Sequence, residues 1–260
     1  MLRVWLWAGL GFLYLPIAVL VAISFNDSRL TTVWSGFSLR WYATLTQDTA
    51  LREAAWLSLR IAVVAATGAT LLGGLAGVAL ARLPRFRLRA VFAGLLTAPL
   101  VLPDLLIGLA LLLLFVAMEQ ATGWPAGRGE LTIVLAHITV GLAFVAVVVE
   151  SRLTDMGSTL EEAAMDLGAS PVWAFLRVTL PIMAPSLVSG WLLAFTLSFD
   201  DVVIASFVSG PGASTLPMVV FSTLRLGSTP VLNALASVML VLFAGLLLLA
   251  ARLQRWRGRA

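Results

Sequence analysis

Three aspartates stand within or beside long apolar stretches, and their carboxylates are suited to hold a cation. Asp104 follows Pro103 near the middle of one stretch, and Asp200 and Asp201 are adjacent near the end of another. A charged side chain in a bilayer is costly unless it is hydrated or paired, so it is a functional candidate by default. We predict that these carboxylates line a water-filled route for a cationic substrate.

The alternative is that these aspartates bind backbone groups at helix breaks or lie at the outer interface. It applies most to Asp201, because neighbours on a helix point about 100° apart and at most one of the pair faces the route. The two interpretations differ in chemistry, because a carboxylate that accepts hydrogen bonds from a helix end is not available to a cationic substrate.

The other groups that could do chemistry are few. His137 is the one histidine and there is no cysteine, which excludes disulfides, thiol catalysis and a multi-histidine metal site within this chain. All 17 basic residues are arginine, whereas a P-loop places a lysine on the nucleotide phosphates, so the chain is not itself a P-loop ATPase. We expect His137 to make an interhelical hydrogen bond, with a proton relay as the alternative.

Residues 159–181 are the one long charge-bearing segment in the second half of the chain, and they predict two short helices joined by a tight turn. Apolar residues recur in the first part with the i, i+3, i+4, i+7 spacing of one helix face: Leu160, Ala163, Ala164 and Leu167. We expect this small apolar face to lie inward and the acidic residues to lie outward.

Both short helices carry capping signals. Ser158 and Glu161 have the spacing of a capping box before the first helix. Gly168 follows the last apolar position, where a C-cap glycine often stands. Ser170 and Pro171 then predict the N-cap and the first turn of the second helix.

The composition places these residues in a membrane. The 260 residues are 60% hydrophobic and only 12% charged, with a mean hydropathy of +1.01, whereas soluble domains are about 25% charged. We therefore predict an all-α integral membrane protein, a polytopic transmembrane helical bundle in which residues 1–260 form one domain.

Six apolar stretches are long enough to cross a bilayer, since about 20 residues suffice. They are roughly Val4–Phe25, Trp56–Ala81, Val91–Met118, Leu131–Val149, the stretch from Ile182 to Asp200, and Leu232–Ala251. The first could instead be a cleaved signal peptide, but its apolar run is longer than usual, so we expect a retained helix. Residues 209–217 must turn, and the segment 202–230 is left as either re-entrant or interfacial.

The second stretch contains a face of small residues. They recur every four positions: Ala65, Ala69, Gly73, Gly77 and Ala81. Such a face predicts close helix packing and implies no chemistry.

The placement of arginine predicts the orientation in the membrane, because cytoplasmic segments are enriched in it. With a cytoplasmic N-terminus, eleven arginines lie inside: Arg3, Arg82, Arg85, Arg87, Arg89, Arg152, Arg177, Arg252, Arg255, Arg257 and Arg259. The other six lie outside: Arg29, Arg40, Arg52, Arg60, Arg128 and Arg225. Both termini are therefore expected in the cytoplasm, together with residues 159–181.

The segment with the two short helices resembles the EAA loop of bacterial ABC-importer permeases. Glu162-Ala163-Ala164, three residues, Gly168, nine residues and Val178-Thr179-Leu180-Pro181 match that loop at every spacing, with Val178 where isoleucine is commonest. The resemblance implies a type I ABC-importer permease fold and a cytoplasmic coupling loop, residues 150–181, that docks on the ATPase. It implies ATPase contacts from Glu161, Glu162, Ala163, Ala164, Asp166, Leu167, Gly168 and Ala169.

A narrower resemblance covers nearly the whole chain. It is carried by residues 195–212, reading FTLSFDDVVIASFVSGPG, and by 215–218, 99–104, 24–26 and 36–42. These segments are similar to the spermidine/putrescine permease subunits of polyamine importers, of the C type. The resemblance implies a polyamine substrate and a pair of two different permeases, and carboxylates complement such multivalent cations. Permeases for other organic solutes or for ferric iron are the alternatives.

The resemblance also implies the partners and the cell compartment. It implies a complex in the bacterial inner membrane with a second permease, two ATPase chains that bind ATP and magnesium, and a periplasmic substrate-binding protein. It implies no cofactor in this chain and no nucleic acid.

Two other classes are weaker alternatives. A secondary transporter would use the aspartates as proton or sodium sites, but it leaves the loop unexplained. An intramembrane enzyme would need an aspartyl pair of Asp104 and Asp200, since the chain has neither a GxSG nor an HExxH motif.

Overall fold

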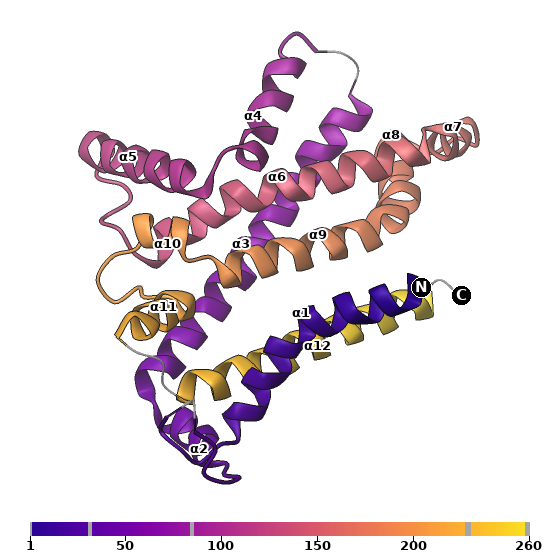
Figure 1. Cartoon of the computed structure of the whole chain (residues 1–260). Coiled ribbons are helices and arrows are strands. Elements are labelled where there is room, and N and C mark those ends of the chain that lie inside the picture. Colours follow the sequence, from indigo (N-terminus) through magenta and orange to yellow (C-terminus); the bar gives the residue numbers. More distant parts are fainter. Residues whose placement is uncertain (1, 31–32, 84–85, 227–229, 258–260) are drawn as a thin grey trace. The chain divides into compact units, whose positions relative to one another are not determined.

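The computed structural model describes residues 2–30, 33–83, 86–226 and 230–257, and these fold into helices without a named strand (Figure 1). The helices are α1 (Leu2–Ser24), α2 (Arg40–Gln47), α3 (Thr49–Arg82), α4 (Arg89–Val101), α5 (Asp104–Thr122), α6 (Glu130–Met156), α7 (Thr159–Asp166), α8 (Pro171–Ala174), the π-helix η1 (Phe175–Thr179), α9 (Leu180–Asp200), α10 (Val203–Val208), α11 (Leu216–Leu226) and α12 (Pro230–Arg257). The predicted all-α class is confirmed for this part of the chain. Arg85, Arg259 and residues 227–229, which entered the predictions above, lie outside it.

Five helical stretches among the described residues are long and apolar enough to cross a membrane. They are Val4–Ser24, Thr49–Arg82, Asp104–Thr122, Glu130–Met156 and Pro171–Asp200. Each falls on a predicted span, in agreement with the predicted polytopic membrane protein. The sixth predicted span lies in α12, whose described apolar part, Pro230–Gly245, is shorter than those five.

The third predicted span is wrong as one continuous helix. α4 ends at Val101, Leu102 is extended at φ −76° and ψ 139°, and α5 begins at Asp104. Pro103 causes the break, because proline has no N–H to donate and disfavours the helical conformation in the residue before it. In Figure 1, α4 and α5 leave the break in different directions. Asp104 is therefore the first residue of a helix rather than the middle of one.

The contacts divide the chain into two compact units. One contains residues 1–53 and 219–260, where α1 and α2 both pack on α12. Its connecting loop is organised around the buried Asn26, whose side chain donates to the Val33 carbonyl at 2.7 Å and accepts from the Ser35 N–H at 2.9 Å. The other unit, residues 54–218, contains every candidate functional residue discussed below.

The second unit is built around α6, which packs against α9, α4 and α10. The small-residue face of α3 is confirmed as a packing face on the same helix. A Cβ atom at Gly73 would stand 2.5 Å from the Leu142 carbonyl oxygen, and one at Gly77 would stand 2.7 Å from that of Ala146. Only glycine allows the two backbones to approach this closely.

The segment after α9 turns as predicted. α10 ends at Val208, residues 209–215 are not helical, and α11 follows. Gly210 belongs to this turn, and a Cβ there would stand 2.1 Å from the Arg128 carbonyl oxygen. Whether 202–230 is re-entrant or interfacial stays a prediction.

Candidate functional site

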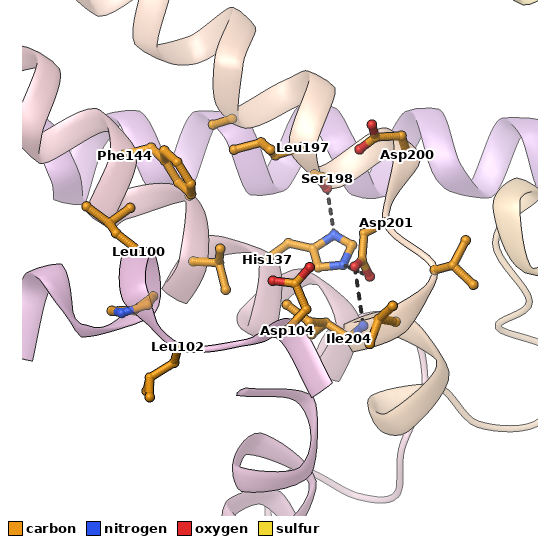
Figure 2. Close-up of a pocket in the computed structure, with 16 residues that line it drawn as sticks. Leu100, Leu102, Asp104, His137, Phe144, Leu197, Ser198, Asp200, Asp201 and Ile204 are labelled. Atoms are coloured by element: carbon orange, nitrogen blue, oxygen red, sulfur yellow. Dashed lines mark hydrogen bonds and ion pairs between the residues drawn. The ribbon is translucent and has the colours of Figure 1, made fainter. Parts of the chain in front are cut away.

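The three predicted aspartates line one cavity of about 460 Å³ in the second unit. Asp104 comes from the start of α5, Asp200 from the end of α9, and Asp201 from the link to α10. His137 of α6 lines the same cavity (Figure 2). The Pro103 break and the end of α9 therefore bring carboxylates that are about 100 residues apart in the sequence to one place.

The Asp201 carboxylate already accepts hydrogen bonds from the neighbouring backbone. Its Oδ2 accepts a hydrogen bond from the Ala205 N–H at 2.7 Å, and its Oδ1 accepts from the Ile204 N–H at 3.3 Å. These N–H groups belong to the first turn of α10 and have no partner within that helix. Asp201 thus caps α10, which is the local role given above as the alternative for this residue.

His137 ties α6 to the end of α9. Its Nδ1 lies 2.6 Å from Ser198 Oγ, and its Nε2 lies 3.2 Å from Asp201 Oδ2. A neutral imidazole with its proton on Nε2 satisfies both contacts, because Ser198 then donates to Nδ1 and Nε2 donates to the carboxylate. The predicted interhelical hydrogen bond is confirmed. Ser198 was missed from the sequence, since a serine in an apolar helix carries no signal of its own.

Asp104 and Asp200 remain exposed in the structure. No arginine lines the cavity, and neither carboxylate forms an ion pair among the described residues. Figure 2 shows Asp200 set apart from Asp104, His137 and Asp201. Among the described residues, no group of three or more His, Cys, Asp or Glu side chains could hold a metal ion. The cavity therefore offers negative charge at separate points.

The second candidate site is the segment that contains α7 and α8. α7 ends as predicted at a glycine, with Gly168 at φ +91°. The Gly168 N–H donates to the Met165 carbonyl at 2.9 Å, and the Ala169 N–H donates to that of Ala164 at 3.0 Å. This pair of bonds is the Schellman arrangement, which requires a left-handed residue that glycine supplies. The Ser170 Oγ then accepts from the Trp173 N–H at 3.3 Å and caps α8.

The predicted capping box at the start of α7 is wrong. Ser158 Oγ lies 2.5 Å from a carboxylate oxygen of Glu162, not of Glu161, and makes no cap bond to the backbone. The reason is geometric, because Ser158 has a helical backbone at φ −105° and ψ −6° instead of the extended one of an N-cap. Glu161 meanwhile is held elsewhere, by Arg82 and Thr179.

The predicted orientation of α7 is also wrong. No residue of α7 is buried, and the apolar Leu160 and Leu167 are 51% and 90% exposed. The side chain that faces inward is the acidic Glu161, of which 15% is exposed. Glu161 pairs with Arg82 on the inner side of α7, and the apolar residues lie on its exposed side. α8 continues this surface with Val172 and Trp173, which are 68% and 52% exposed.

Apolar helices that could cross a bilayer, together with an acidic cavity at a helix break, define this chain as a membrane transport protein. It belongs to the family described as "Binding-protein-dependent transport system inner membrane component", whose sequence profile matches residues 69–259.

Two relatives illustrate the family. The chain is 58% identical over 232 residues to the putrescine transport system permease protein PotI of Escherichia coli (strain K12), a match covering 89% of this chain and 83% of the relative. It is 43% identical over 245 residues to the spermidine/putrescine transport system permease protein PotC of Haemophilus influenzae (strain ATCC 51907 / DSM 11121 / KW20 / Rd), covering 94% and 93%.

Solved structures share the fold. A bacterial ABC transporter involved in the import of the acidic polysaccharide alginate matches with a TM-score of 0.68 and 15% identity, over 98% of this chain and 94% of the other. The same kind of transporter in complex with an alginate-bound periplasmic protein matches with a TM-score of 0.73 and 14% identity, over 98% and 92%.

Proposed function

We propose that this chain is a permease subunit of an ATP-driven importer of the polyamines putrescine and spermidine. The observation that carries the proposal is the 58% and 43% identity, over most of the chain, to permeases named for putrescine and spermidine/putrescine transport. A likeness of this extent is expected to include the substrate route as well as the fold.

The chemistry of the cavity supports this substrate class. A polyamine is a linear cation with charges at separate points along an apolar chain. Asp104 and Asp200 present negative charge at separate points, and no arginine neutralises them there. Apolar lining residues such as Leu100 and Phe144 suit the methylene segments between the ammonium groups. Asp201 and His137 contribute by fixing the cavity wall.

The exposed face of α7 and α8 supports a docking role for the predicted coupling residues. Ala163, Met165 and Leu167 lie on the exposed surface of α7, where a helix-in-groove contact with an ATPase would bury them. Met165 was not among the predicted contacts. Of the other predicted contacts, Glu162, Asp166 and Gly168 are also exposed, whereas Glu161, Ala164 and Ala169 are half-buried. In this arrangement ATP and magnesium bind to the partner chain, and the coupling loop 150–181 receives the movement.

The complete assembly follows from this proposal. It contains a second, different permease, an ATPase dimer and a periplasmic binding protein in the bacterial inner membrane. This chain contributes one permease domain, residues 1–260, with six spans and both termini in the cytoplasm.

The test is ATP hydrolysis by the complex in nanodiscs, with its binding protein, measured with different solutes. Putrescine and spermidine are expected to stimulate hydrolysis, while a neutral sugar and the zwitterion 2-aminoethylphosphonate are not. The zwitterion is a needed comparison because one relative is named for it. This relative, the "Putative 2-aminoethylphosphonate transport system permease protein PhnV" of Salmonella choleraesuis (strain SC-B67), is 30% identical to this chain over 253 residues, covering 95% of this chain and 91% of the relative. Stimulation by the zwitterion or the sugar alone would contradict the polyamine substrate but not the assignment to an ATP-driven importer. Transport that does not depend on an ATPase would contradict that assignment as well.

A further inference from the structure

Arg82, the last residue of α3, joins its own helix to α6 and α7 with one guanidinium group. Its Nε lies 3.0 and 2.9 Å from the two carboxylate oxygens of Glu161 in α7. Its two terminal nitrogens donate to the carbonyls of Leu153 at 3.0 Å and Gly157 at 2.7 Å. Those carbonyls belong to the C-terminal end of α6, where arginine commonly satisfies unpaired acceptors.

Glu161 extends the same network to α9. Its Oε1 also accepts a hydrogen bond from Thr179 Oγ1 at 2.7 Å. Thr179 is fully buried and is the last residue of the π-helix η1, which leads directly into α9. A π-helical turn inside a longer helix is rare and is frequently found at functional positions.

The ion pair is well shielded, with 19% of the Arg82 side chain and 15% of the Glu161 side chain exposed. Arginine suits such a site because its planar fork of donors is fixed. A shielded pair with all these contacts is costly to break, because either partner alone would leave a charge uncompensated. The contact between α7 and the spans is therefore stiff rather than sliding.

Two of the helices joined here, α6 and α9, also line the acidic cavity. α6 carries His137 and α9 carries Ser198 and Asp200, while α7 lies at the opposite end of α6 from α5 and α10 (Figure 1). We propose that Arg82, Glu161 and Thr179 form a strut that passes the movement of α7 to α6 and α9, with Arg82 as its positioning residue. This inference rests on the proposed docking of α7 on an ATPase.

The structure offers two comparison sites. Arg89 and Glu150 form an ion pair of 3.8 Å near the same helix ends, but their side chains are 41% and 33% exposed and the pair does not include α7. Exposed pairs of this kind contribute little. Leu167, in contrast, belongs to the proposed docking surface, so Leu167→Asp should remove the ATPase from the complex.

The experiment compares Arg82→Ala, Thr179→Val, Arg89→Ala and Leu167→Asp in the complete complex with its putrescine-loaded binding protein. Co-purified ATPase, basal ATP hydrolysis and putrescine taken up per ATP are measured for each. Arg82→Ala should keep the ATPase and the basal rate but lower uptake per ATP about tenfold, the order of a typical coupling free energy. Thr179→Val, which removes one hydrogen bond and keeps the ion pair, should lower it less, and Arg89→Ala should not change it.

The proposal is overturned if Arg82→Ala and Thr179→Val both take up putrescine per ATP as the wild type does. It is equally overturned if Arg82→Ala behaves like Leu167→Asp while Thr179→Val is normal, because Arg82 would then serve docking only. If Arg82→Ala does not assemble for another reason, Thr179→Val decides alone. A wild-type complex that no solute stimulates contradicts the proposed function instead, and it is recognised before any variant is compared.

Discussion

Asp200 and Asp201 are neighbours in the sequence, yet the structure gives them different surroundings. Asp201 accepts hydrogen bonds from two backbone N–H groups of α10 and contacts His137. Its carboxylate therefore holds the link between α9 and α10 in place. Asp200, at the end of α9, is exposed and lines the same cavity. Of the two, Asp200 is the one available to a passing cation.

We predict opposite phenotypes for the two residues. Asp200→Asn should lower putrescine uptake while leaving the melting temperature of the purified complex unchanged. Asp201→Ala should lower the melting temperature, because it leaves buried N–H groups without an acceptor, at a cost of about 1–3 kcal/mol each. Uptake assays and thermal unfolding of both variants check this, and a destabilised Asp200→Asn with a stable Asp201→Ala would reverse the assignment.

At the scale of elements, the turn between α7 and α8 depends on one backbone angle. Gly168 has φ +91°, and a Cβ atom added to it would meet nothing within 4 Å, so a substitution there would be strained but would not clash. Its N–H is also used, since it donates to the Met165 carbonyl. The turn sets the direction in which α8 leaves α7 and therefore shapes the exposed apolar surface.

We predict a graded series at this position. Gly168→Ala should weaken coupling, because a left-handed conformation costs an ordinary residue about 1–2 kcal/mol. Gly168→Pro should abolish uptake while the chain still inserts in the membrane, because proline can neither adopt this φ nor donate the hydrogen bond. Gly94→Ala is the control, since Gly94 lies inside α4 and a Cβ added there would also meet nothing within 4 Å. Normal uptake by Gly168→Pro would show that the turn is not needed.

The same loop shows what the sequence could and could not predict. The turn at Gly168 and the cap at Ser170 depend on neighbours within a few residues, and both were predicted correctly. The inward side of α7 depends on Arg82, which is 79 residues away from Glu161, and no local spacing reveals such a pair. Considered in the sequence alone, Arg82 and the three arginines that follow it by residue 89 indicate only an orientation in the membrane.

The break at Pro103 and the acidic cavity also combine local features, which the sequence reveals, with distant contacts, which it does not. Pro103 accounts for the break at Leu102 by the local chemistry of proline. The direction that α5 takes after the break depends on its packing, chiefly against α10. The three aspartates were predicted as candidates because charge is rare in apolar stretches. Their assembly with His137 and Ser198 is set by the packing of α6 on α9, which hydrophobic periodicity does not determine.

At the scale of the whole molecule, orientation is the property that most needs a direct measurement. The described residues contain five helical stretches that could cross a membrane, and α12 is the sixth predicted span. The chain has no cysteine, so a single introduced thiol reports one position without interference.

We predict that a membrane-impermeant thiol reagent labels Gln47→Cys and Ala126→Cys in intact cells. Both residues are exposed and lie in segments expected outside. Ser158→Cys, exposed at the start of α7, should be labelled only after the cells are permeabilised. Labelling of Ala126→Cys and Ser158→Cys from the same side would contradict the predicted crossing by α6 between them.

The attachment of Glu161 to Arg82 also limits how permeases of this kind can be recombined. The coupling loop 150–181 looks like an exchangeable module, since both of its helices and their turn are local. Yet one of its carboxylates is held by a residue at the end of α3, outside the loop. A chimera that transplants the loop to change the ATPase it recognises must therefore carry a matching residue at position 82, or the graft will place α7 with its acidic side unheld.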